Sequence, residues 1–106
     1  MAVLGNFVRL EPGVRKRLRL ANHMFLDKVI KDPMTGQPKT VRVLQFDVVE
    51  EDGQPVRKVF SVTSEKLASS FLPYLEGQRY RNYVVEIEKR GEGFLTDYSV
   101  RWMPLP

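Results

Sequence analysis

The chain has 106 residues, 42% of them hydrophobic and 28% charged, which is typical of one small globular domain. It contains no cysteine, so disulfides, thiolate metal sites and cysteine nucleophiles are excluded. No apolar run reaches the roughly 20 residues of a membrane-spanning helix, and the first residues lack the pattern of a signal peptide. We therefore expect one intracellular domain over residues 1–106, with its core in 14–102, cytoplasmic or associated with the nucleoid and not bound to a membrane.

The 17 Lys and Arg residues outnumber the 13 Asp and Glu residues, which gives a net charge of +4. The excess lies in the first part of the chain. Residues 1–46 carry nine basic and three acidic side chains, whereas residues 47–106 carry eight and ten. One basic surface of this kind suits a polyanionic partner, although a charged surface that only keeps the protein soluble has the same composition.

Residues 15–30 alternate in polarity, which predicts a long strand. Its apolar side holds Leu18, Leu20, Met24 and Leu26, and its other side holds Arg15, Arg17, Arg19, His23 and Phe25. The next segment, residues 32–38, contains two prolines and a glycine and predicts a loop in which the chain reverses.

The rest of the chain predicts two hairpins separated by a helix. Residues 40–50 and 56–62 read as strands joined at Asp52-Gly53. Ser64 suits a helix N-cap, and apolar residues then recur at three- and four-residue intervals up to Leu75, with Pro73 limiting the helix to about two turns. Residues 80–89 and 94–102 read as two further strands joined by a turn around Gly91 and Gly93, with Glu86 and Glu88 on an exposed side.

This order of elements resembles the oligonucleotide/oligosaccharide-binding (OB) fold. The resemblance covers residues 14–102 and rests on the long first strand, the Asp52-Gly53 hairpin, the helix from Ser64 to Leu75 and the last hairpin. It implies a mainly β, five-stranded Greek-key barrel or half-barrel with one short helix between strands 3 and 4. It also implies the function of small OB-fold proteins that bind single-stranded DNA with little sequence preference, using an outer groove of strands one to three. RNA is not distinguished from DNA by these residues.

A single-strand groove needs cations for phosphates and flat rings on which bases stack. Three arginines at alternate positions of one strand lie about 7 Å apart, a spacing close to that of successive phosphates. A charged edge that prevents strands from aggregating would have the same pattern. The residues expected to bind nucleic acid are Arg15, Arg17, Arg19, His23, Phe25, Lys39, Arg42, Arg57, Phe60, Arg81 and Tyr83.

The orientation of Phe60 depends on the length of the hairpin loop. A two-residue loop places Phe60 on the side of Gln45, as a stacking platform, whereas a three-residue loop places it with Leu44 and Phe46 in the core. The alternation of Phe94, Tyr98, Val100 and Trp102 instead predicts core packing.

Nothing in the sequence favours catalysis. His23 is the one histidine, no nucleophile motif surrounds it, and the carboxylates near residue 50 lack the spacing of a calcium loop. We expect no catalytic residues, no metal and no cofactor. The alternative to a nucleic-acid-binding protein is a non-catalytic β-barrel module that docks within a replication, repair or viral assembly; a protein partner or a homo-oligomer is left open.

Overall fold

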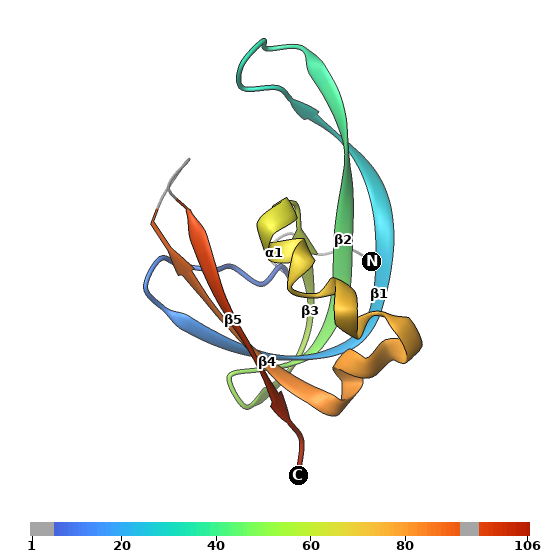
Figure 1. Ribbon diagram of the computed structural model, residues 1–106, viewed down its shortest axis with the longest axis vertical. Helices are drawn as coiled ribbons and strands as arrows, with labels where there is room; N and C mark the ends of the chain where they lie inside the picture. The colour runs from blue at the N-terminus through green and yellow to red at the C-terminus, as the bar shows by residue number, and fades with distance from the viewer. Residues whose placement is uncertain (1–5, 92–95) are drawn as a thin grey trace.

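The computed structural model describes residues 6–91 and 96–106. Five antiparallel strands form one sheet in the order β3-β2-β1-β4-β5 (Figure 1). Their bounds are β1 Arg15–Lys31, β2 Pro38–Glu51, β3 Gln54–Val62, β4 Tyr83–Arg90 and β5 Asp97–Pro104. A short helix lies between β3 and β4, so the predicted mainly β class and the predicted order of elements are confirmed. The strands at the two ends of the order, β3 and β5, share no ladder among the described residues.

The connection between β3 and β4 consists of α1 (Glu65–Ser69) and two 3₁₀ segments, η1 (Leu72–Tyr74) and η2 (Glu76–Asn82). The Ser64 hydroxyl accepts a hydrogen bond from the Leu67 amide at 3.3 Å, as expected of an N-cap. The positive φ of Gly77 and Gln78 kinks η2. The prediction of a strand from residue 80 was wrong at its start, because this kinked segment continues to Asn82 and β4 begins at Tyr83.

The core lies between one face of the sheet and the α1–η2 connection. Leu18, Phe46, Phe71 and Tyr80 are fully buried. Tyr98, Val100 and Trp102 are partly buried and pack against this core, as the alternation predicts, whereas Phe94 lies outside the described residues. The Trp102 indole also donates a hydrogen bond to the Ser70 carbonyl at 3.1 Å, which fixes the helix on the last hairpin.

The hairpin of β1 and β2 extends far beyond the rest of the sheet. β1 pairs with β4 only over Arg15–Leu18, and β2 pairs with β3 only from Leu44 onward. Residues 24–43, which we call the arm, therefore form a two-stranded projection that rises above the body in Figure 1. The arm contributes to the elongated dimensions of the molecule, 48 × 32 × 27 Å.

A register shift decides the orientation of Phe60. The loop at Asp52-Gly53 has two residues, since Glu51 pairs with Gln54. Between Pro55 and Lys58, however, β3 contains one residue more than β2 does, which moves Phe60 from Gln45 to Phe46. Phe60 is 3% exposed, so of its two alternatives the core position is confirmed and the stacking platform is wrong. The bulge, and not the loop length, places it in the core.

Candidate nucleic-acid interface

A second bulge divides the expected site between two faces of β1. Leu20 pairs with Val48 and Asn22 with Asp47, which leaves Ala21 without a partner on β2. A bulge of this kind breaks the alternation of side chains along the strand. Beyond it, His23 pairs with the core residue Phe46.

Phe25 follows the same change of face. It pairs with Leu44, which is 2% exposed and belongs to the core. His23 and Phe25 therefore continue the core-facing side of β1, which we call the inner face. The prediction that they share a face with the arginine row was wrong, because the bulge at Ala21 interrupts the alternation of side chains along β1.

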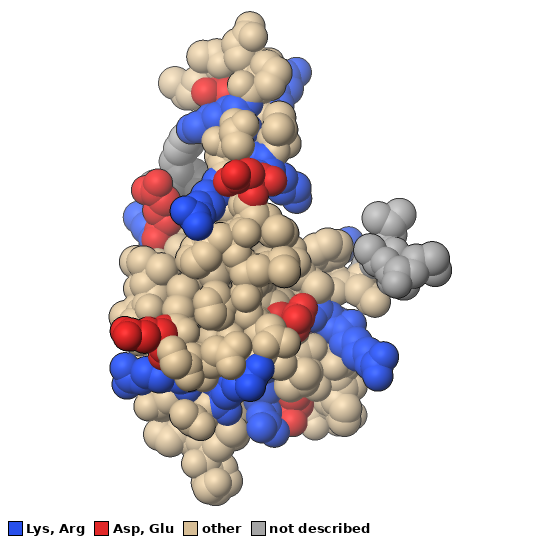
Figure 2. Space-filling view, turned by 90° about the vertical axis from the view of Figure 1, so that its right-hand side faces the viewer, with Lys and Arg blue, Asp and Glu red and all other residues tan. Residues whose placement is uncertain are grey.

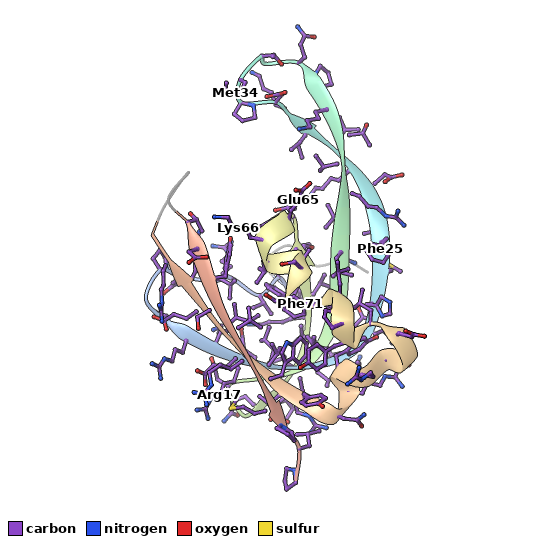
Figure 3. All side chains as sticks on the ribbon, viewed as in Figure 1. Arg17, Phe25, Met34, Glu65, Lys66 and Phe71 are labelled. Atoms are coloured by element: carbon purple, nitrogen blue, oxygen red, sulfur yellow. The ribbon has the colours of Figure 1, made fainter. Side chains whose placement is uncertain are left out.

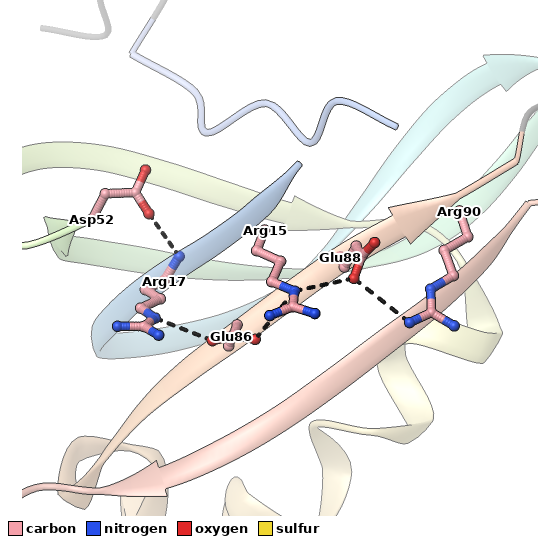
Figure 4. A network of polar contacts seen from close by, with 6 residues as sticks. All are labelled: Arg15, Arg17, Asp52, Glu86, Glu88 and Arg90. Atoms are coloured by element: carbon pink, nitrogen blue, oxygen red, sulfur yellow. Dashed lines mark hydrogen bonds and ion pairs between the residues drawn. The ribbon is translucent and has the colours of Figure 1, made fainter. Parts of the chain in front are cut away.

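The arginine row lies on the opposite, outer face and is ion-paired. Arg17 lies 3.1 Å from a Glu86 carboxylate oxygen, and Arg15 lies 3.4 Å from Glu88 and 4.0 Å from Glu86 (Figure 4). Arg90 contacts Glu88 at 3.6 Å from the other side. Three arginines thus share two glutamates, which leaves this row little charge with which to attract phosphate.

The same network corrects the expectation that Glu86 is exposed. Its side chain is covered by Arg15 and Arg17, and the residue is 5% exposed. Arg19 has a separate partner, Glu50, at 3.5 Å. At Arg15 and Arg17, β1 pairs with β4, and its ladder with β2 begins at Leu18.

The feature of the arm that best suits a nucleic acid is the pair formed by Phe25 and Arg42. The guanidinium carbon of Arg42 lies 4.6 Å from the centroid of the Phe25 ring, within the range of a cation–π contact. Phe25 is 43% exposed, and Arg42 is exposed as well. Figure 3 labels Phe25 on the arm and Met34 at its tip.

The arm also carries cations that form no ion pair with a described residue, although Asp27 is the ladder partner of Arg42. Among the described residues, none of the arm's Lys and Arg side chains forms an ion pair, in contrast to the row on the body; these are Lys28, Lys31, Lys39 and Arg42. Figure 2 shows basic side chains on the arm beside acidic and uncharged ones. Lys28 and Lys31 were not among the expected residues. The signal available for them was the length of the first strand, 17 residues against nine in β3, which leaves part of it without a third strand.

His23 connects Phe25 to the core. Its Nδ1 lies 2.7 Å from the Tyr80 hydroxyl, and its ring meets the edge of Phe25 with centroids 6.3 Å apart. Burial raises the pKa of Tyr80, and Asp47 acts in the same direction, whereas Arg81 and Gln78 oppose it. The hydroxyl thus stays neutral and serves as a hydrogen-bonding partner that fixes the imidazole beside the Phe25 ring.

Two of the expected binding residues have structural contacts instead. Arg81 on η2 donates to the carbonyl of Ala21 and, at 2.8 Å, to the side chain of Asn22, so it holds the bulge of β1. Tyr83 packs edge-on against Tyr74, with ring centroids 5.2 Å apart. Neither residue lies on the arm.

The remaining cations are dispersed. Lys39 pairs with Ile30 near the tip of the arm, on the face opposite to Phe25. Arg57 is exposed on β3, away from the arm. Of the expected residues, the structure therefore brings together His23, Phe25 and Arg42, and places the others elsewhere.

A separate charged cluster lies at the far end of β1. Glu51 contacts Lys58 at 2.6 Å and Lys16 at 3.2 Å. Burial alone would raise the pKa of Glu51, but hydrogen bonds and charge from the two lysines outweigh it and lower that pKa. Burial alone would lower the pKa of Lys16, but hydrogen bonds and charge from Glu51 and Asp52 outweigh it and raise that pKa. The ion pairs of this cluster stabilise the fold.

The described residues contain no group of three or more His, Asp or Glu side chains placed to hold a metal ion. None of the helices in the described ranges has the length and apolar character needed to cross a bilayer. Comparison of the chain with family models, curated proteins and solved structures finds no match. The functional argument therefore rests on the arm itself.

Proposed function

We propose that the protein is a non-catalytic, OB-like β-barrel or half-barrel that binds single-stranded DNA through the inner face of the arm, with little sequence preference. The observation that carries this proposal is the exposed Phe25 ring with the Arg42 guanidinium 4.6 Å from its centroid. A base that stacks on this ring brings its phosphate close to a cation that is already in place.

The surroundings of the pair support a strand of several nucleotides. Lys31 lies on the same face of β1 as Phe25, further toward the tip of the arm, and has no ion-pair partner among the described residues. Unpaired cations of this kind attract a phosphate backbone and release its counterions. In OB folds, the loop between the first two strands is one of the elements that contact oligonucleotides.

A single strand is favoured over a duplex for two reasons. Stacking on Phe25 needs an unstacked base, and bases in a duplex are already stacked on one another. The described part of the chain also offers no helix for the major groove, since α1 has five residues and is packed against the core through Leu67. We therefore expect affinity to depend on salt and on strandedness more than on base sequence.

The test is a titration of fluorescently labelled oligothymidine with the Phe25→Ala variant and a matched Phe7→Ala control. Phe7 is 48% exposed, close to the 43% of Phe25, but it pairs with Val59 of β3 and lies beside Leu26 and Val43, on the face of the sheet opposite to Phe25. Loss of a stacking ring costs roughly 1–3 kcal/mol, so Phe25→Ala should weaken binding about 5- to 150-fold. Phe7→Ala should leave it unchanged. Equal affinities for all three proteins would refute the proposal.

A second candidate function is the protein-interaction module. It is favoured by the apolar side chains that the arm exposes, among them Val29 at 68% and Met34 at 83%. A module of this kind would bind its protein partner without nucleic acid and would show no preference for single strands. The two functions are thus separated by the same titration.

A further inference from the structure

The arm has a free strand edge along β1. β4 occupies this edge only up to Leu18, and η2 covers it near the bulge, where Arg81 contacts Ala21 and Asn22. From Met24 to Lys31, no strand among the described residues pairs with β1 on this side. A free edge presents unpaired backbone N–H and C=O groups, and Val29 adds an apolar side chain that is 68% exposed.

We infer that this edge pairs antiparallel with the same edge of a second copy of the chain. A pairing of identical edges is closed after two copies, whereas pairing β1 with the β2 edge of another molecule would propagate into a filament. The β2 edge of the arm carries Lys39 and Arg42 and no acidic residue, so two such edges would repel. The β1 edge carries both signs of charge, Asp27 and two lysines.

Symmetry and charge select one register. In a two-fold antiparallel pair, one residue must lie opposite its own copy, and partners on the two strands share a face. Centring the pair on Asp27 or on Lys28 would place like charges opposite each other. Centring it on Val29 places two valines together and sets Asp27 opposite Lys31 of the second copy, twice.

The neighbouring registers are less favourable. A centre at Leu26 would bring Ile30 and Lys31 of the second copy against Asn22 and Ala21, where η2 already lies. A centre at Ile30 would leave only three residues of each β1 in the ladder, against five for Val29. The short ladder about Val29 predicts a dimer that forms reversibly and depends on protein concentration.

The pairing would join the two arms into a four-stranded sheet. Because the two-fold axis runs perpendicular to such a sheet, both inner faces point the same way. Each Phe25 lies four residues from the centre, so the two rings would be separated by about 27 Å along the strands. The inference rests on the free edge and its charges, and does not depend on what the inner face binds.

Charge reversal tests the register in sedimentation velocity experiments over about a hundredfold range of protein concentration. The wild type should shift from monomer to dimer. Asp27→Lys and Lys31→Asp should each raise the dissociation constant of the dimer about tenfold or more, because each places like charges opposite each other. An equimolar mixture of the two variants should dimerise again, since opposite charges then face each other at both positions. A wild type that stays monomeric throughout, or a mixture that stays monomeric, would overturn the inference.

A covalent test is possible because the chain has no cysteine. Residues directly opposite in an antiparallel pair have Cα atoms about 4.5–5.5 Å apart, within the range of a disulfide. Val29→Cys should therefore form a disulfide-linked dimer under mild oxidation. Ile30→Cys is the matched control: its own copy would lie two positions away along the strand, roughly 8 Å distant and beyond reach. Equal cross-linking of both variants, or of neither, would contradict the register.

Discussion

Arg42 and Phe25 come from neighbouring strands of the arm, yet they are not directly opposite each other: Phe25 pairs with Leu44, and Arg42 pairs with Asp27. The contact between the guanidinium and the ring is thus a diagonal one, across the inner face. Its geometry depends on the bulge at Ala21, which turns Phe25 onto this face. The register of β1 and β2 therefore determines that the two side chains meet, and the guanidinium lies over an exposed ring before any ligand binds.

The two groups of arginines should differ in the salt dependence of binding. Arg42→Gln should reduce the magnitude of the logarithmic salt slope by about 0.7, the value for one phosphate contact on a single strand. Arg17→Gln should leave the slope unchanged, because Arg17 is held 3.1 Å from Glu86. The measurement is oligothymidine affinity at several salt concentrations. A slope whose magnitude falls for Arg17→Gln and not for Arg42→Gln would indicate that the outer face binds the single strand.

Truncation of Phe60 and truncation of Phe25 should lower the free energy of unfolding by very different amounts. Phe60→Ala should lower the free energy of unfolding by about 3–5 kcal/mol, the usual effect of removing a core aromatic ring. Phe25→Ala should change it far less, since the ring is 43% exposed. Urea denaturation of the two variants beside the wild type checks this. A large loss of stability for Phe25→Ala would mean that the Phe25 ring packs in the core.

The cluster around Glu51 should make stability depend on acidity. Because the pKa of Glu51 is lower in the folded protein than its ordinary value of 4.5, its stabilising effect is complete above that value and is lost as pH falls through the folded pKa. Glu51→Gln should cost about 1–3 kcal/mol at neutral pH. In urea denaturation at decreasing pH, the difference between wild type and variant should narrow below about pH 4.5. A difference independent of pH would contradict the role of this carboxylate.

Arg81 should stabilise the bulge and not bind nucleic acid. Arg81→Gln removes its hydrogen bonds to the Ala21 carbonyl and the Asn22 side chain, which should cost about 1 kcal/mol. Amide hydrogen exchange should then become faster in the segment from Ala21 to His23. A matched Arg79→Gln variant, which loses a hydrogen bond to the Pro73 carbonyl and a cation–π contact with Tyr74, both in the 3₁₀ region, should leave that segment unchanged.

The sequence was sufficient to predict the order of elements and the Ser64 cap, because alternation, turn residues and caps are local signals. The sequence was insufficient to predict on which face of the sheet Phe25 and Phe60 lie. Both depend on bulges, at Ala21 and between Pro55 and Lys58, where one strand gains a residue relative to its neighbour. No residue near Ala21 marks the bulge locally; it is held by Arg81, some 60 positions away in the chain. The burial of Glu86 under Arg15 and Arg17 likewise requires the pairing of β1 with β4.

The central claim is that the inner face of the arm, and not the arginine row of the body, contacts the single strand. The most direct measurement is a titration of ¹⁵N-labelled protein with short oligothymidine, followed by amide chemical shifts. The account predicts that shifts concentrate around Phe25 and Arg42 and extend toward Lys31, and that a duplex of equal length causes much smaller ones. Shifts confined to Arg15–Arg19 and their partners on β4, or no shifts with the single strand, would contradict it.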